Sequence, residues 1–594
     1  MPPAPTAPEA AVRRDGGGWL TRALIALALL GGLVQSVRFW WVSDDAYIVF
    51  RYSKHLYQGH GLVFNLGERV EGFTDLLWVL WCSLAFPCGV TPETWANVSG
   101  IACFGATILL LAWLHRRWAR QAHPAATLTL PFAALAAGLH PDWAVYATGG
   151  LETSAITAAL VCGFACLAVL NEKRWAPWAA GASFAVAGLL RPDGVLPAFL
   201  AGLFVLWRGT PRLVTALRYA GTFLVLWTPA QAWRMAYYGD FFPNTYYAKS
   251  ANLPYYSQGL YYVWTYVQVY WPLAALPALW LLWLAWTGWK SRASELAGRD
   301  ADAPLVVLAG AVALAYTLYV ARVGGDFMFS RLLIPATPFA LLVLDYTLLR
   351  FLGRWPALGL AAVLILAGHP FWTAFKQDRM DYGRGISNER LYYMNVMQGP
   401  YLDYTGETLR RYFEGLPVRM LMPGSEARVI YRAEVPYALE VHGLTDAHVA
   451  RQPLPVRGRP GHEKVASPHY ILVERSVHFT TSEAGYYMFV GGDRHIPFME
   501  IRIERARVFV LTWHPQIMKA LQERGVNVPD FLGDLDRTIA VLDRLSDEEA
   551  ADLYRKLSNF YFIHVPDPKR EEAFRRRLRM DRPTFEAGPP ISIP

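Results

Sequence analysis

The chain carries apolar segments that recur from Leu20 to about Trp372 and are absent after that point. A helix of about 20 apolar residues spans the hydrocarbon core of a bilayer, and several of these segments approach that length. The chain is also 54% hydrophobic and only 18% charged, a balance that a water-soluble protein of 594 residues rarely shows. The sequence therefore predicts a polytopic α-helical membrane protein with about 11 spans, followed by a separate domain without spans.

The segment 75–90 decides how many spans there are and how they are oriented. It is apolar, but counting it as a span would place the cations at 116, 117 and 120 outside and reverse several later loops against the positive-inside rule. We therefore interpret it as an interfacial or re-entrant helix. The remaining spans are expected near residues 20–42, 95–114, 125–140, 152–170, 176–190, 195–208, 213–233, 262–287, 303–321, 331–349 and 356–372.

Cations gather at alternate helix ends, so the net charge of +8 reflects membrane topology and gives no reason to expect a nucleic-acid partner. With residues 1–19 as a cytoplasmic tail, the first external loop covers 43–94, and acidic loops collect on one face of the membrane. These loops contain Asp44-Asp45, His140-Pro141-Asp142, Gly150-Leu151-Glu152, Arg191-Pro192-Asp193, Tyr238-Gly239-Asp240 and Gly324-Gly325-Asp326.

The composition changes at about residue 373, where mixed charge replaces the long apolar runs. Short alternating runs at 418–422 and 470–473 are typical of strands, and 531–558 is helix-like. An odd number of spans puts this part outside, so we expect an extracytoplasmic α/β domain over 373–567. Residues 568–594 are basic and then Pro-rich, which is typical of a loosely held tail.

The pair Asp44-Asp45 directly follows the first span and is the first candidate for chemistry. Two adjacent carboxylates at a helix exit are costly without water, a cation or a metal, although a solvated helix end is the alternative interpretation. A carboxylate here could take a proton from an acceptor hydroxyl, and Arg51 is a cation close by in the same loop. A divalent cation held by the pair with Glu152 stays open, because no ligand set at diagnostic spacing is present.

The turn Arg191-Pro192-Asp193-Gly194 separates two predicted spans. It is either a plain Pro-Gly turn with a snorkelling arginine or a clamp for the phosphate of a lipid carrier. Asp326 and Arg331 flank a second glycine-rich turn that would line a polar cavity, and Arg331 and Arg234 are further candidates for binding the phosphate.

The loop 234–249 combines cations with many aromatic residues. An interfacial aromatic belt explains part of this composition. Asn244, Tyr246 and Lys249 also suit a sugar, because rings stack on its apolar face and polar groups bond its hydroxyls.

Several other chemistries lack their signatures. The sequence contains no Walker lysine loop, no His-Glu-x-x-His, no CxxC pair and no Gly-x-Ser-x-Gly. Its five cysteines all lie in the hydrophobic half, so the predicted external domain has no disulfide scaffold. A donor already mounted in the membrane therefore fits better than a nucleotide-dependent reaction.

The order of several motifs resembles the GT-C membrane glycosyltransferases of the mycobacterial terminal β-1,2-arabinofuranosyltransferase (AftB) type. The matching segments are 44–52 (DDAYIVFRY), 59–75 (GHGLVFNLGERVEGFTD), 150–153 (GLET), 191–194 (RPDG), 238–249 (YGDFFPNTYYAK), 324–328 (GGDFM), 443–450 (GLTDAHVA) and 459–464 (RPGHEK).

This resemblance implies a GT-C fold in the bacterial cytoplasmic membrane, a polyprenyl-phosphate arabinofuranose donor and an extracytoplasmic cell-envelope glycan as acceptor. It also implies that Asp44 and Asp45 lie near the reacting centre, and that Glu152 and Arg191 face the donor phosphate. Two alternatives remain. One is the same fold using another lipid-linked sugar, with lipopolysaccharide or a pilin-like protein as acceptor. The other is a lipid or sugar transporter or flippase, for which ionisable residues within the spans and internal repeats would be expected.

Overall fold

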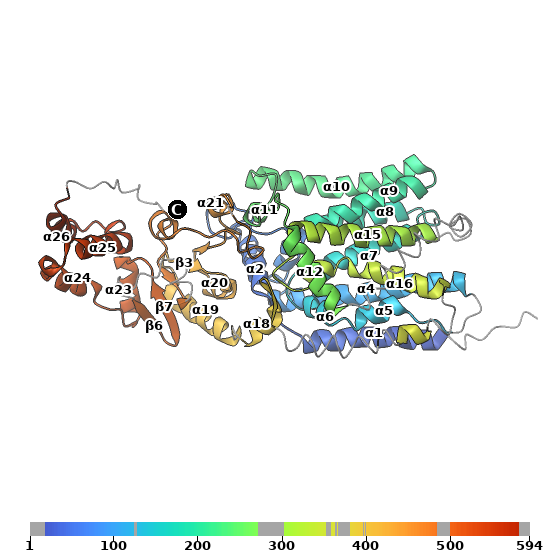
Figure 1. The fold of residues 1–594 in the computed structure, drawn as a ribbon, viewed down its shortest axis with the longest axis horizontal. Helices are drawn as coiled ribbons and strands as arrows, with labels where there is room; N and C mark the ends of the chain where they lie inside the picture. The colour runs from blue at the N-terminus through green and yellow to red at the C-terminus, as the bar shows by residue number, and fades with distance from the viewer. Residues whose placement is uncertain are drawn as a thin grey trace, which may run out of the picture.

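The structure is a computed structural model that describes residues 18–123, 128–270, 302–351, 358–362, 365, 380–395, 397, 399–454, 456–483 and 499–580. It is elongated, with a bundle of long helices at one end and a mixed α/β domain at the other (Figure 1). Short helices and loops from both parts lie between them, among them α2 (Asp44–Tyr57), α11 (Asn244–Ala248), α18 (Glu389–Asn395) and α21 (Ala447–Ala450).

The bundle contains the apolar helices that the sequence predicts. Three helices of the described part are long and apolar enough to cross a membrane, namely Trp19–Arg38, Pro92–Ala122 and Ala303–Val323, and Thr153–Ala168 and Ala176–Leu190 are shorter apolar helices. The helices of the bundle are α1 (Gly18–Arg38), α4 (Pro92–Ala122), α5 (Phe132–Gly138), α6 (Pro141–Ala147), α7 (Thr153–Ala168), α8 (Ala176–Leu190), α9 (Val195–Arg208), α10 (Arg212–Tyr238), α12 (Tyr256–Val269), α15 (Ala303–Val323) and α16 (Thr337–Phe351).

The boundaries of α8 and α9 agree with the predicted spans 176–190 and 195–208, but the continuous span predicted at 125–140 is wrong. Residues 128–131 are not helical, and Pro131 precedes the short helix α5. Pro141 then starts α6, with the His140 side chain accepting from the Trp143 N–H at 3.2 Å. Prolines at both ends keep the segment short, because a proline breaks the helical hydrogen-bond ladder. Residues 271–287 of one predicted span, and all of the last except 358–362 and 365, lie outside the described residues.

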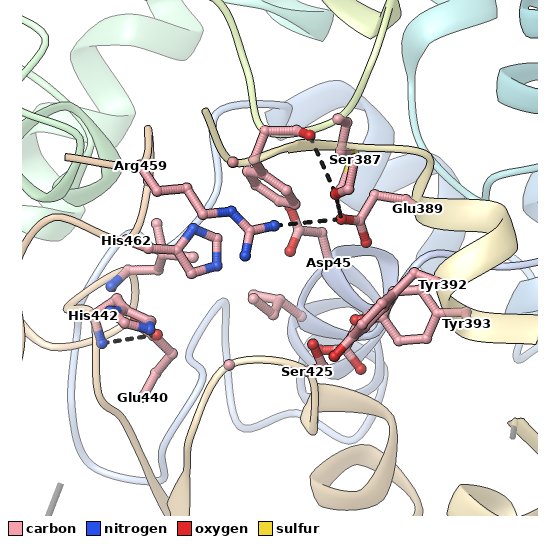
Figure 2. Close-up of a pocket in the computed structure, with 18 of the residues that line it drawn as sticks. Asp45, Ser387, Glu389, Tyr392, Tyr393, Ser425, Glu440, His442, Arg459 and His462 are labelled. Atoms are coloured by element: carbon pink, nitrogen blue, oxygen red, sulfur yellow. Dashed lines mark hydrogen bonds and ion pairs between the residues drawn. The ribbon is translucent and has the colours of Figure 1, made fainter. Parts of the chain in front are cut away.

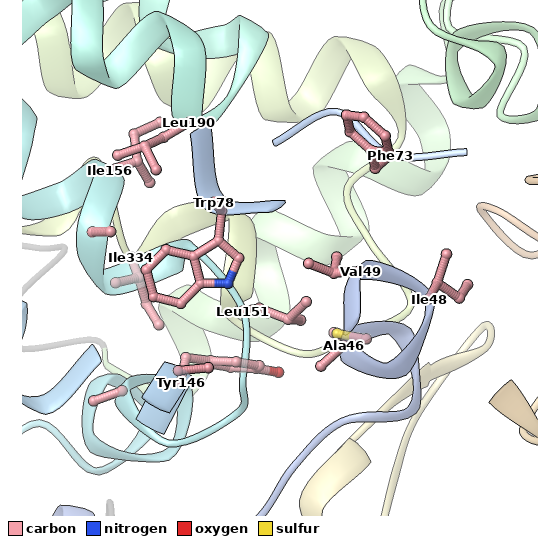
Figure 3. Packing of buried hydrophobic residues seen from close by; sticks show 14 of the residues in the cluster. Ala46, Ile48, Val49, Phe73, Trp78, Tyr146, Leu151, Ile156, Leu190 and Ile334 are labelled. Atoms are coloured by element: carbon pink, nitrogen blue, oxygen red, sulfur yellow. The ribbon is translucent and has the colours of Figure 1, made fainter. Parts of the chain in front are cut away.

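The first loop, 43–94, lies between the helix bundle and the C-terminal domain. It contains α2 (Asp44–Tyr57) and α3 (Leu76–Ser83), the latter within the segment predicted to be an interfacial or re-entrant helix. Trp78 of α3 is buried against residues of α2, α6, α7 and α8 (Figure 3), and its indole N–H donates to the Gly150 carbonyl at 3.0 Å. This packing fixes the loop relative to the ends of the membrane helices, which stabilises the position of α2.

The C-terminal domain is built on a five-stranded mixed sheet in the order β4-β3-β5-β7-β6. β3 pairs in parallel with β4 and β5, whereas β7 pairs antiparallel with β5 and β6. The predicted strand at 418–422 is β3, but 470–473 lies in a helical turn, η3 (Tyr470–Glu474). The strands are β1 (Asp381–Gly383), β2 (Ile386–Ser387), β3 (Arg419–Met422), β4 (Tyr437–Glu440), β5 (Phe479–Thr480), β6 (Glu500–Ile503) and β7 (Ala506–Val510).

Helices cover this sheet and continue beyond the predicted end of the domain. Residues 568–578 were expected to belong to a loose tail, but they form a helix whose Phe574 is fully buried against Tyr554 and Phe562. One apolar side chain among many charges is enough to anchor a short helix to the preceding one. The helices are α18 (Glu389–Asn395), α19 (Gly399–Phe413), α20 (Ala427–Ala433), α21 (Ala447–Ala450), α23 (Pro515–Glu523), α24 (Phe531–Ala540), α25 (Asp547–Leu557) and α26 (Pro568–Leu578).

The domain is fastened to the first loop by buried polar groups. The Arg51 guanidinium donates to the carbonyls of Phe64 and Val435, both at 2.7 Å, and of Ile430 at 3.3 Å. Asn65 exchanges two hydrogen bonds of 2.9 and 3.0 Å with the backbone of Ala438 in the edge strand β4. Buried polar groups that lose their hydrogen-bond partners cost free energy. These contacts therefore hold the first loop and the C-terminal domain in one arrangement.

Candidate active site

Two cavities meet where the helix bundle contacts the C-terminal domain. The larger, about 520 Å³, lies over the ends of the bundle helices, and Leu444, Arg457, Pro460 and Gly461 are the residues of the C-terminal domain in its wall. Its charged lining residues are Asp45, Asp75, Glu152, Arg191, Asp193, Lys249, Arg322, Asp326, Arg331 and Arg457. The acidic and basic turns that are far apart in the sequence thus lie around one space.

The smaller cavity, about 300 Å³, is lined by both parts of the chain (Figure 2). The bundle side supplies Asp44, Asp45, Lys249, Phe327 and Met328, and the C-terminal side supplies Glu389, Glu440, His442, Arg459 and His462 among others. Asp45 and Lys249 line both cavities. These two residues therefore lie where the contents of the two cavities would meet.

Glu152 lies between two arginines in the larger cavity. Its carboxylate is 3.2 Å from Nη2 of Arg331 and 3.7 Å from Nε of Arg191. Arg191 also forms two hydrogen bonds with Asp193, of 2.7 and 3.1 Å, and Tyr316 donates to the same Asp193 carboxylate at 2.6 Å. The two guanidinium groups are thus held near each other by Glu152, which contacts both.

Some polar atoms of Arg191 and Arg331 form no hydrogen bond to the described residues. Among the residues that the structure describes, Nη1 of Arg191, Nε of Arg331 and Oγ1 of Thr245 are buried without a hydrogen-bond acceptor or donor, and all three residues line the larger cavity. A buried charged donor without a partner costs free energy, so such atoms are usually matched by a ligand or water. The arrangement suits an anion such as a phosphate, which guanidinium groups bind with strong charge-assisted hydrogen bonds.

Asp44 and Asp45 have different surroundings although they are neighbours. The Asp44 carboxylate accepts the backbone N–H groups of Ala427 at 2.9 Å and Arg428 at 3.0 Å, at the start of α20. It thereby satisfies two of the donors that a helix N-terminus leaves unpaired. Burial raises the pKa of Asp44 to about 7, although these two hydrogen bonds oppose the shift. Asp44 is therefore tied to the C-terminal domain.

Asp45 is more accessible and is surrounded by charges from the larger cavity. Burial raises its pKa above the usual 3.8, while the nearby Lys249 and Arg331 lower it and Asp326 and Glu152 raise it. A carboxyl group with a raised pKa is a better proton acceptor once ionised. The position and the charge environment of Asp45 both fit a general base.

The other predicted site residues divide into two groups. Glu152, Arg191, Asp193, Tyr246, Lys249, Asp326 and Arg331 all line the larger cavity. Arg51 and Asn244 line neither cavity. Both side chains donate to backbone carbonyls of the C-terminal domain, and Arg51 donates also to Phe64 of the first loop.

Arg234 is ion-paired with the buried Glu71 and lines a third pocket of about 260 Å³. This pocket contains Leu76, Leu189, Val195 and Trp227, and it shares Thr74, Pro192, Phe242 and Pro243 with the larger cavity. It extends the polar cavity into an apolar groove between bundle helices.

Several lining residues were not predicted. Asp75 is buried in the larger cavity, and burial together with Glu152 raises its pKa to about 8. Glu389, Glu440 and His442 enter the smaller cavity from the C-terminal domain. A signal existed for Asp75, in the motif 59–75, and for Arg459, Gly461 and His462, in the motif 459–464, because both motifs belong to the predicted family resemblance.

Within the described ranges, no three His, Cys, Asp or Glu side chains are placed so that they could hold a metal ion together. The pair Asp44-Asp45 with Glu152 is therefore no ready-made ligand set in this arrangement. The two acids diverge, one toward α20 and one toward the cavities.

The comparisons with known proteins agree on the kind of protein. A terminal β-(1→2)-arabinofuranosyltransferase of Mycobacterium tuberculosis is 29% identical over 445 residues, which cover 65% of this chain and 68% of that protein. The protein of the same name from Corynebacterium glutamicum is 30% identical over 379 residues, 55% of this chain and 52% of the relative. The predicted resemblance is confirmed. No protein-family model matches the chain.

The fold is also that of a solved glycosyltransferase. The crystal structure of ArnT from Cupriavidus metallidurans bound to undecaprenyl phosphate aligns with a TM-score of 0.50 at 14% identity, and it covers 83% of this chain and 98% of that chain. The chain is thus a multi-pass membrane glycosyltransferase with a GT-C fold. The exact number of spans remains a prediction.

Proposed function

We propose that this AftB-like enzyme transfers arabinofuranose from a polyprenyl-phosphate donor to a cell-envelope glycan, at the extracytoplasmic face of the bacterial cytoplasmic membrane. The observation that carries the proposal is that Asp45 and Lys249 line both cavities, while the larger cavity holds the unpartnered donors of Arg191 and Arg331. The names of the relatives support arabinofuranose, and the ArnT complex supports an undecaprenyl-type lipid carrier.

In this mechanism the donor occupies the larger cavity, with its phosphate between Arg191 and Arg331 and its lipid chain along the apolar pocket beside Trp227. Asp45 takes the proton of an acceptor hydroxyl. The acceptor oxygen bonds to the anomeric carbon as the bond from that carbon to the phosphate oxygen breaks. The two arginines stabilise the charge of the departing polyprenyl phosphate, and stabilisation of developing charge is commonly the largest contribution to catalysis.

The test uses the purified full chain with a panel of labelled polyprenyl-phosphate sugars and an arabinan acceptor. The expected result is transfer from the arabinofuranose donor and little from the others. Transfer from a different lipid-linked sugar would contradict the assignment of the donor. Consumption of none of them, together with movement of the lipid across a vesicle membrane, would favour a flippase. A parallel series with EDTA determines whether transfer needs a divalent cation.

A further inference from the structure

The smaller cavity has a composition that the donor does not explain. We propose that it binds the terminal sugar of an uncharged glycan acceptor, with Nε2 of His462 accepting a hydrogen bond from an acceptor hydroxyl. The inference rests on the proposed function and specifies the chemical class of the second substrate.

The position of the cavity is the first argument. It shares Asp45 and Lys249 with the larger cavity, and Ile48, Leu444 and Gly461 also line both. Gly461 has φ +81°, and a Cβ there would lie 3.7 Å from the Lys249 side chain and 3.8 Å from the Phe327 ring. A sugar in the smaller cavity would thus present a hydroxyl to Asp45 while the donor lies on the other side.

The second argument is the tautomer of His462. Its Nδ1 lies 3.3 Å from the carbonyl oxygen of Pro460, and because a carbonyl only accepts, Nδ1 carries the proton. Burial, with His442 and Arg459 nearby, lowers the pKa of His462 to about 3, so the ring is neutral and Nε2 is a hydrogen-bond acceptor. The ring stands edge-on to Phe327, with 4.8 Å between centroids and an interplanar angle of 90°, which fixes its orientation.

The third argument is charge. Among the described residues, the cavity is lined by five acidic side chains, Asp44, Asp45, Asp381, Glu389 and Glu440, and by two lysine or arginine side chains, Lys249 and Arg459. Figure 2 shows Arg459 directed toward Glu389, and the two side chains are 3.7 Å apart. A phosphorylated acceptor such as lipopolysaccharide would meet an excess of acid, whereas the hydroxyls of a neutral glycan can bond carboxyl groups in either protonation state.

Apolar ring surface completes the site. Phe327 and Tyr392 line the cavity beside these polar groups, and Tyr393 closes its wall near Asp44. Aromatic faces next to convergent polar groups are the usual environment for a sugar ring. Side chains from both parts of the chain therefore recognise the acceptor.

The experiment measures initial rates with the full chain at varied donor and acceptor concentrations. We expect His462→Ala to raise KM for a neutral arabinan oligosaccharide about tenfold, the size of one lost hydrogen bond, and to leave the donor KM unchanged. His462→Gln keeps an acceptor atom and should restore part of the affinity. The matched control is His469→Ala, because His469 is an exposed histidine of the same domain.

Acceptor chemistry gives the second measurement. The neutral oligosaccharide should be used at least about tenfold better than the same oligosaccharide bearing a phosphate near its acceptor end. Equal use of both, transfer to a peptide hydroxyl, or a rise in donor KM for His462→Ala and His462→Gln would overturn this inference while the proposed function stands. A wild-type enzyme that consumes no polyprenyl-phosphate sugar would overturn both.

Discussion

The two cavities meet at Asp45 but are built differently. The larger lies on the ends of membrane helices, and its arginines are held in place by Glu152 and Asp193. The smaller is walled by α2, α18, the ends of β3 and β4, and loops of both parts of the chain, and most of its charged lining groups are acids. Under the proposed function, the donor would lie on the helix bundle and the acceptor between the bundle and the C-terminal domain. Acceptor choice would then depend on how the two parts of the chain pack together.

The largest expected effect concerns Asp45, the carboxylate that lines both cavities. Asp45→Asn should lower kcat by about 10²- to 10⁴-fold, the usual contribution of a general base, without reducing donor binding. Single-turnover rates and binding of polyprenyl phosphate measure the two properties separately.

Asp44→Asn is the matched control, because the Asp44 carboxylate bonds backbone N–H groups of α20. It should retain most of the transfer rate in protein that still folds. Wild-type rates in the Asp45 variant, or equal loss in both variants, would remove the distinction between these neighbours.

Next in size is a variant confined to the larger cavity. Arg331→Gln should lower kcat/KM for the donor about 10- to 100-fold, because it removes a charged donor from the phosphate position. The acceptor KM should stay constant, which is measured by varying each substrate at a fixed concentration of the other. Arg69→Gln, an exposed arginine over the Tyr237 ring, serves as the control. A change in acceptor KM alone would show that the cavities are not separate sites.

A smaller effect is expected on stability from Asp44→Ala. Losing a helix-capping side chain costs about 0.5–2 kcal/mol, and the thermal midpoint should fall by a few degrees.

The effect should depend on pH. Burial raises the pKa of Asp44 to about 7 in the folded protein, against the ordinary value of 3.8, so between these pH values the folded state binds a proton that the unfolded state releases. The contribution of Asp44 is therefore fully present below about pH 4 and is lost as pH rises toward 7. The difference in thermal midpoint between the wild type and Asp44→Ala should decrease over that pH range. A difference that increases would contradict a raised pKa of Asp44 in the folded protein. Asp240→Ala, which removes a half-exposed ion pair with Arg451, should change the midpoint little.

The smallest effect is a shift in the pH–rate profile. Lys249 favours the ionised form of Asp45, so Lys249→Met should raise the pKa of Asp45 and move the acidic limb of kcat/KM upward by about one pH unit. Asp326→Asn removes a like charge and should move the same limb downward. Shifts in the same direction in both variants would exclude Asp45 as the group that titrates.

The bundle was largely predictable from the sequence, because a bilayer imposes long apolar helices with turns of recognisable composition. The exception is the span predicted at 125–140. Its average hydropathy resembles that of a membrane span, but Pro131 and Pro141 interrupt the helix. The acidic and basic turns could be assigned to one face of the membrane, and eight of the predicted site residues, Asp45 among them, line the larger cavity for that reason.

The contribution of the C-terminal domain could not be predicted in the same way. Glu440 reaches the neighbourhood of Asp45 because β4 docks on the first loop through Ala438 and Asn65, which lie several hundred residues apart in the sequence. Glu389 reaches it at the start of α18, because the backbone of Ser387 bonds the backbone of Phe327 and Phe329. No local pattern specifies such a contact. Arg51 and Asn244 were assigned to the site for their chemistry, but their hydrogen bonds show that they serve this docking instead.

The capping of α20 by Asp44 has a consequence for engineering. The helix belongs to one domain and its cap to the other, so neither is complete alone: the excised domain would expose two unpaired N–H groups, and the truncated bundle would keep an acid without its donors. Exchanging the C-terminal domain between related enzymes to alter acceptor preference therefore requires transplanting the first loop together with it. The smallest part of this protein that could be exchanged as a unit is therefore the C-terminal domain together with the first loop.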